Sequence, residues 1–208
     1  MRRIFIVMFL LIISFSDVYG ASPFSVDDDA SIDNNYREIE IGISNKGNKL
    51  NSFGSLGVGL NNYFSIGVAI DIYPLPFNAF DISGKLRFVN TPLLGTAVAI
   101  NYGMDNILSI NLIQRFDIKY FTFYMNGGMN SDTVNIMNFG VSLQNDKLLN
   151  EKLNVGIEYY GEKGNDISSN VGIGCSFTFN NGLCFYGGYK YCITDKNGFT
   201  IVGIVFDF

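Results

Sequence analysis

From residue 36 to residue 208 the chain alternates between large apolar residues and small or polar ones with a period of two. In the segment FSIGVAIDIY, residues 64–73, every second residue from Phe64 onward is large and apolar. In FDISGKLRF, residues 80–88, a helix would place Ile82, Lys85 and Leu86 on one face, whereas a strand puts Lys85 on the face opposite the other two. Because successive side chains of a strand point to opposite faces, this period predicts β-strands.

The alternation recurs in twelve segments. Their centres lie near residues 40, 56, 68, 84, 98, 111, 124, 138, 156, 173, 187 and 203. The mean spacing of about fifteen residues accommodates a membrane strand of about ten residues and a short connection. We therefore predict an all-β fold with twelve antiparallel strands. Ten strands is the alternative, if the segments near 50–60 or 106–116 are not strands.

Residues typical of turns lie between these segments. They are Asn61-Asn62, Asn90-Thr91-Pro92, Asn180-Asn181-Gly182 and Asp195-Lys196-Asn197-Gly198. A three-residue loop at 180–182 would pair Phe179 with Leu183, both on the apolar face, and would place Gly182 in the left-handed conformation that such loops favour. The same parity puts Cys175 on the apolar face and Cys184 on the other face, which argues against a disulfide between them.

The two faces of the predicted strands differ in composition. One face carries Ile, Val, Leu, Phe and Met with very few charges. The other is rich in glycine and asparagine, yet long charged side chains interrupt it. Small residues of this kind make room for long ones inside a closed barrel, whereas glycine on a solvent-facing sheet weakens the strand without a packing return. We predict that the interior is lined by Glu40, Asp71, Asp81, Lys85, Arg87, Arg115, Glu158 and Lys190.

The apolar face suits a membrane because a charge on the lipid side of a barrel costs about 2–4 kcal/mol near the midplane. Aromatic residues gather toward the strand ends, as they do at membrane interfaces. A soluble exported β-sandwich is the alternative, since it would also alternate but with its apolar face buried.

The first twenty residues resemble a secretory signal peptide. Arg2 and Arg3 precede the apolar run IFIVMFLLIISF, and small residues at Val18 and Gly20 suit cleavage before Ala21. An uncleaved anchor is the alternative. Residues 21–35 are acidic and aperiodic, which predicts a flexible leader ahead of a barrel at 36–208.

Composition excludes several functions. Removal of residues 1–20 leaves 12 basic and 18 acidic residues, which does not suit a nucleic-acid partner. The chain has no histidine, so it has neither a Ser-His-Asp triad nor a His-ligated metal. No motif points to a catalytic Ser-Lys dyad or acidic pair, although the sequence does not exclude one. We expect no enzymatic activity, no metal and no cofactor.

The chain resembles the small outer-membrane β-barrels of bacteria as a class. The signal peptide, the alternating strands over 36–208 and the aromatic last residue carry the resemblance. It implies residence among outer-membrane lipid and a C-terminal strand read by the barrel-assembly machinery. The residues that match this assembly signal are Val202, Ile204, Phe206 and Phe208. Thr200 departs from the apolar residue that is usual at its position.

Two functions fit a membrane barrel of this size. Twelve strands lie between filled eight-stranded barrels and open sixteen-stranded porins. The charged interior then either forms a narrow pathway for ions or small hydrophilic solutes, or pairs internally in a non-conducting barrel with a structural or ligand-binding role. The sequence leaves both open, and it does not identify the solute.

Overall fold

The computed structural model describes residues 37–46, 49–73, 80–103, 108–131, 135–149, 152–163, 167–180 and 182–207. The predicted signal peptide and leader lie outside these residues, as does Phe208. The described strands are β1 (Arg37–Lys46), β2 (Lys49–Asn61), β3 (Phe64–Tyr73), β4 (Phe80–Asn90), β5 (Leu94–Gly103), β6 (Leu108–Ile118), β7 (Phe121–Ser131), β8 (Asn135–Leu148), β9 (Leu153–Lys163), β10 (Ile167–Thr178), β11 (Leu183–Cys192) and β12 (Asn197–Asp207).

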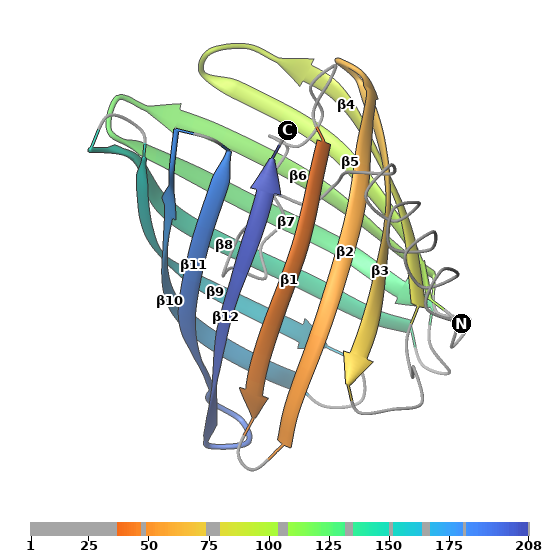
Figure 1. Ribbon diagram of the computed structural model, residues 1–208. Coiled ribbons are helices and arrows are strands. Elements are labelled where there is room, and N and C mark those ends of the chain that lie inside the picture. Colours follow the sequence, from red (N-terminus) through yellow and green to blue (C-terminus); the bar gives the residue numbers. More distant parts are fainter. Residues whose placement is uncertain are drawn as a thin grey trace, which may run out of the picture.

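The twelve strands form one closed antiparallel barrel (Figure 1). Each strand pairs with its neighbours in the sequence, and β1 pairs with β12 over nine residue pairs from Glu38–Asp207 to Lys46–Phe199. The predicted twelve-stranded barrel is therefore confirmed, and the ten-stranded and sandwich alternatives are wrong. None of the described segments is a helix long and apolar enough to cross a membrane.

The turns predicted near Asn61 and Gly182 form as their residue types require, whereas the turn predicted at 195–198 ends at Lys196, because Asn197 and Gly198 begin β12. The side-chain Oδ1 of Asn61 accepts hydrogen bonds from the amides of Tyr63 and Phe64 at 2.8 and 2.9 Å, which closes the turn from β2 to β3. At the turn from β10 to β11, the amide of Phe179 donates to the carbonyl of Leu183 at 2.7 Å. Gly182 has a φ of 79°, as predicted for this position.

The even number of strands places the start of β1 and the end of β12 at the same end of the barrel. We call this the termini end and the opposite one the loop end. The termini end is the upper end in Figure 1. The turns at the termini end are short, as periplasmic turns of membrane barrels are.

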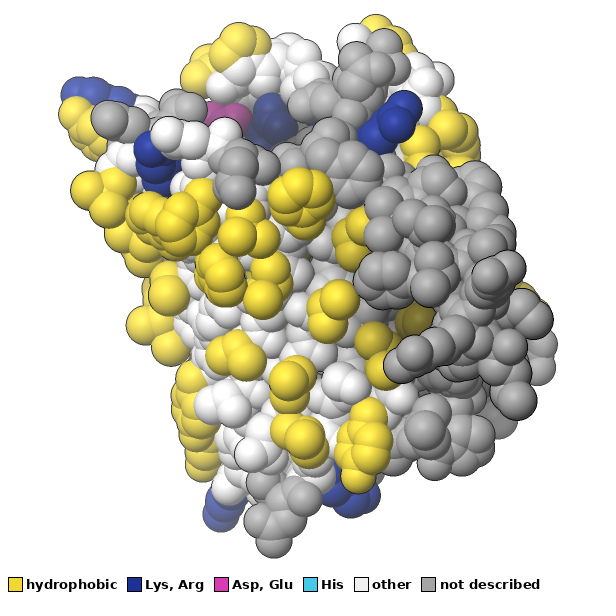
Figure 2. Space-filling model, viewed as in Figure 1, with side chains coloured by type: hydrophobic (Ala, Val, Ile, Leu, Met, Phe, Trp, Pro, Cys, Tyr) yellow, Lys and Arg dark blue, Asp and Glu magenta, His cyan; other side chains and the backbone are white. Residues whose placement is uncertain are grey.

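The outer wall is apolar. Large side chains such as Ile41, Phe88 and Ile173 are 57%, 59% and 61% exposed. On the face seen in Figure 2, such side chains cover the wall between the two rims, and Lys and Arg gather at the rims. Soluble monomers rarely expose contiguous apolar surface of this extent, whereas a lipid-facing wall requires it.

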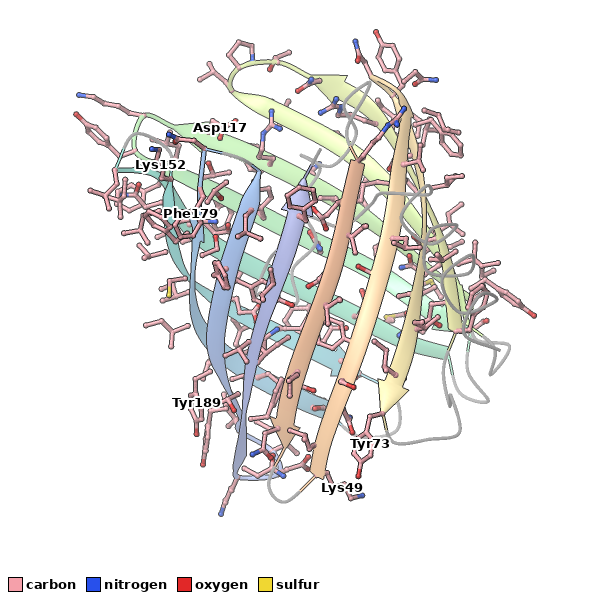
Figure 3. All side chains as sticks on the ribbon, in the orientation of Figure 1. Lys49, Tyr73, Asp117, Lys152, Phe179 and Tyr189 are labelled. Atoms are coloured by element: carbon pink, nitrogen blue, oxygen red, sulfur yellow. The ribbon has the colours of Figure 1, made fainter. Side chains whose placement is uncertain are left out.

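Aromatic residues lie toward both ends of the wall. Tyr73 and Tyr189 lie toward the loop end, and Phe179 lies toward the termini end (Figure 3). This distribution matches the aromatic girdles that hold membrane barrels at the two interfaces.

Candidate functional site: the barrel interior

The structure places the eight charged residues predicted for the interior on the inward faces of their strands. Glu40, Lys85, Arg87, Glu158 and Lys190 are buried there. Arg115 and Asp71 are half-buried, and Asp81 is exposed near the loop end. Three further acids, Glu38, Asp117 and Glu162, share the inward parity of Glu40, Arg115 and Glu158 on the same strands. The two-residue period was the signal that could have found them.

One ion pair spans three strands. The Nζ of Lys190 on β11 lies 3.0 Å from the Oε1 of Glu158 on β9, and both side chains are buried. Gly172 on β10 pairs with both residues and lies between them. A Cβ at Gly172 would come within 2.8 Å of the Glu158 Oε1, so the missing side chain provides the space in which the ion pair forms.

A second long side chain crosses a glycine at the barrel closure. Tyr186 on β11 pairs with Gly203 on β12, which in turn pairs with Gly42 on β1. A Cβ on Gly203 would overlap the Tyr186 ring. The ring therefore lies across β12, and its hydroxyl donates a hydrogen bond to the carboxylate of Glu40 on β1.

The same carboxylate also binds β2, because the Ser55 hydroxyl donates to the Oε2 of Glu40 at 3.0 Å. The Phe53 side chain, also from β2, occupies the space that a Cβ on Gly42 would need. The luminal cluster of Tyr186, Glu40, Ser55 and Phe53 thus links β11, β1 and β2 across the closure between the first and last strands.

Two of the predicted luminal bases bind turns at the termini end. The Arg87 guanidinium donates to the carbonyl of Asn62 at 3.0 and 3.3 Å. Arg115 forms an ion pair with Asp117 at 2.9 Å and donates to the carbonyl of Thr91 at 3.2 Å. These arginines hold turns in place as well as contributing charge.

Several large apolar side chains also point inward, which the prediction of a small and polar interior missed. Ile113 is fully buried with Ala97 and Ala99. Tyr186 and Val205 form a second apolar cluster at the closure. The members of each cluster come from neighbouring strands, since Ala97 pairs with Ile113 and Cys184 pairs with Val205, so these inward apolar side chains bury one another.

Amide and hydroxyl side chains complete the interior. Asn138 donates to Asn130 at 3.1 Å, and Asn154 donates to Gln144 at 2.8 Å. Across the described part of the chain, no three residues of the His, Cys, Asp or Glu types are grouped so as to hold a metal ion. The three cysteines are free; Cys184 and Cys192 are buried, and Cys175 is exposed on the outer wall, as its parity predicted.

The predicted assembly signal lies on the outer wall of β12. Val202, Ile204 and Phe206 are 55%, 44% and 41% exposed and alternate with inward-facing residues. Their fourth member, Phe208, lies outside the described residues.

Comparison with known proteins places this fold among porins. No protein-family model matches the sequence, and no curated protein matches it either. Among solved structures, the KdgM porin matches with a TM-score of 0.71 at 10% identity, covering 82% of this chain and 99% of the porin. The NanC porin matches with a TM-score of 0.66 at 6% identity, covering 81% and 98% of the two chains.

The outer membrane protein Omp33 of Acinetobacter baumannii matches with a TM-score of 0.58 at 8% identity, covering 85% of this chain and 99% of Omp33. The chain therefore has the closed barrel fold of these outer-membrane porins over nearly their whole length. At these identities the likeness is one of fold.

Proposed function

We propose that the protein is an outer-membrane channel that passes ions or small hydrophilic solutes through a narrow lumen. The observation that carries the proposal is a closed twelve-stranded barrel with an apolar outer wall and a charged, hydrogen-bonded interior. Such a wall is stable in lipid, and a closed barrel satisfies every backbone hydrogen bond there. The fold shared with porins supports the same compartment and the same kind of function.

The charge of the interior favours cations. Acids outnumber bases among the inward-facing side chains that the structure describes. The acids are Glu38, Glu40, Asp71, Asp81, Asp117, Glu158 and Glu162, and the bases are Lys49, Lys85, Arg87, Arg115 and Lys190. Three of the acids, Asp71, Asp81 and Glu162, lie toward the loop end, where an entering ion meets them first.

One structure of the KdgM porin contains an oligogalacturonate, which is a polyanion. The excess of acids argues against a polyanion for this chain.

We expect purified, refolded protein to give conductance steps in a planar bilayer and a reversal potential that shows preference for K⁺ over Cl⁻. Asp81→Asn should lower the K⁺/Cl⁻ permeability ratio about fourfold, because a unit charge about 10 Å from the ion path stabilises K⁺ and destabilises Cl⁻ by about 0.4 kcal/mol each in water-like surroundings. The matched control is Asp195→Asn, which removes the same charge from the exposed β11–β12 turn and should leave the ratio nearly unchanged. A bilayer that shows no conductance steps with the folded protein would contradict the proposed channel. A reversal potential that shows preference for Cl⁻ would contradict the inference of cation selectivity from the interior charge.

A non-conducting barrel is the second candidate, and one observation favours it. Lys85 and Arg87 are only 3% exposed, and Glu158 and Lys190 are 6% exposed. Charged side chains this deeply covered act first as internal ion-pair and hydrogen-bond partners. In that case the same recordings would show no conductance from protein that is fully folded by heat-modifiable gel migration.

We also propose that the outer face of β12 is recognised by the barrel-assembly machinery, as the class resemblance implies. Phe206→Asn should lower the amount of folded protein in the outer membrane several-fold in cells. The control is Phe185→Asn, a change to a similarly exposed residue on the neighbouring strand β11. Both variants lose comparable lipid contact, so they should refold equally well in detergent. An equal loss in cells would mean that lipid contact alone explains the effect.

A further inference from the structure

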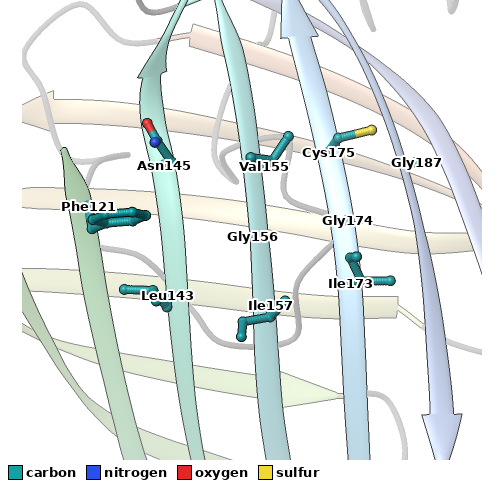
Figure 4. A pocket seen from close by; sticks show the side chains of 10 residues that line it. All are labelled: Phe121, Leu143, Asn145, Val155, Gly156, Ile157, Ile173, Gly174, Cys175 and Gly187. Atoms are coloured by element: carbon teal, nitrogen blue, oxygen red, sulfur yellow. The ribbon is translucent and has the colours of Figure 1, made fainter.

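An apolar furrow crosses the outer wall from β7 to β11 (Figure 4), with a volume of about 530 Å³. It begins at Phe121, the first residue of β7, and ends at Gly187, the fifth residue of β11. Between them, Asn145 pairs with Val155, Val155 with Cys175, and Cys175 with Gly187. The furrow therefore follows one row of paired residues from the rim at the termini end into the wall.

Small side chains create the furrow. On β10 and β11 the pair Cys175–Gly187 lies between the pairs Phe177–Phe185 and Ile173–Tyr189, whose side chains are large. The Phe177, Phe179 and Phe185 rings form a continuous edge-to-face wall on the rim side, with centroids 5.0 and 5.8 Å apart. Because Cys175 carries only a thiol and Gly187 only a hydrogen, this pair leaves a depression between its larger neighbours, and the three rings border that depression.

A second depression adjoins the furrow at the rim. Lys152, Phe177, Phe179 and Asn180 line it. Phe177 is two residues from Cys175 on the same face of β10, so the two depressions lie on either side of the Phe177 ring. Lys152 and Phe179 lie at the same end of the barrel (Figure 3). An ammonium and a side-chain amide at the membrane interface, next to an apolar groove, match the charge and polarity of a lipid with an anionic phosphate.

We propose that these two depressions together bind one phospholipid of the leaflet at the termini end. Lys152 and Asn180 bind its phosphate, and one acyl chain lies in the furrow. Four strand spacings make the furrow about 19 Å long. With strands tilted by about 40°, it descends about 12 Å, which is within the ~15 Å hydrocarbon depth of one leaflet. The inference rests on the membrane insertion proposed above and does not depend on conduction.

Native mass spectrometry tests the site. The protein is refolded into vesicles of equal parts phosphatidylglycerol and phosphatidylethanolamine and extracted in mild detergent. We expect the wild type to retain one phospholipid. Lys152→Glu should lower the retained fraction about tenfold, because it replaces a charge-assisted contact to phosphate with repulsion. Gly187→Leu should lower it similarly by filling the furrow, since a Cβ there makes only ordinary contacts, with Val202 at 3.5 Å.

Two matched variants control for general effects. Lys49→Glu makes the same charge reversal at the loop end and should retain the lipid. Gly127→Leu places the same side chain at an outward-facing glycine of β7 that has open space around it, and it should also retain the lipid.

Co-flotation with vesicles and heat-modifiable migration report insertion independently of lipid retention. Inserted, folded wild type without a retained phospholipid would overturn the site while leaving the membrane barrel intact. Equal loss of lipid in Gly127→Leu and Gly187→Leu would also overturn it, and so would a dimer that forms through the furrow in place of lipid. Failure of every variant and of the wild type to insert would instead contradict the proposed function.

Discussion

Replacing Gly203 with alanine should lower the free energy of unfolding by about 2 kcal/mol, because the new methyl group overlaps the Tyr186 ring. The ring has little freedom to move, since its hydroxyl binds Glu40 and its neighbour Phe53 packs over Gly42 on the next strand. Relief of the overlap would pull the hydroxyl from the carboxylate at the barrel closure. Urea unfolding of refolded protein in lipid vesicles measures the change.

The control is Gly187→Ala, which makes the same substitution on the neighbouring strand. Its Cβ would meet Val202 at 3.5 Å, an ordinary contact, so its effect should stay within about 1 kcal/mol. In a Tyr186→Ala background the ring and its hydrogen bond to Glu40 are both absent. Gly203→Ala should therefore cost little additional stability in that background. If Gly203→Ala alone proves neutral, the ring does not lie across β12 as a fixed contact.

Removing the Glu158 carboxylate, as in Glu158→Ala, should lower the free energy of unfolding by about 3 kcal/mol. The buried ammonium of Lys190 would lose the carboxylate that lies 3.0 Å away, in a position with little access to water. The loss of stability comes chiefly from the buried positive charge of Lys190 that no longer faces a carboxylate, and only in smaller part from the lost attraction between the two side chains. The same urea titration in vesicles measures it.

The double variant Glu158→Leu with Lys190→Met separates these two contributions. A buried ion pair is often replaced by apolar side chains at little cost, so the double variant should recover most of the lost stability. The expected coupling between the two sites is about 2 kcal/mol or more. Additive effects would mean that the two side chains act independently, in which case the space above Gly172 would need another explanation.

The strands and their faces were predictable because the signal is local. A two-residue alternation is read within ten residues, and it assigned Lys85, Glu158 and Lys190 to the inward face, where the structure has them. Turn residues are local as well, and Gly182 has the left-handed backbone that its three-residue loop required.

The inward apolar residues were harder to predict. The alternation places Ile113 and Val205 on the inward face. Because the other inward residues are mostly small or polar, the sequence suggested no role for large apolar side chains there. Tyr73 is a similar case, because it pairs with Ser52 across a register irregularity between β2 and β3, so simple alternation along β3 does not predict its side. A pattern within one strand carries no information about which side chains the neighbouring strand places beside it, or where the register between two strands shifts.

The sequence by itself determined which segments form strands, which face most of their side chains take and that the interior is charged, because each of these depends on neighbours within a few residues. Only the tertiary structure decided which inward-facing side chains become hydrogen-bond or ion-pair partners. Tyr186 and Glu40 are 146 residues apart in the chain and meet because β1 closes on β12. Lys190 reaches Glu158 because the register places Gly172 between them. Closure and register are properties of the whole barrel, and they determine which charges in the interior become pairs.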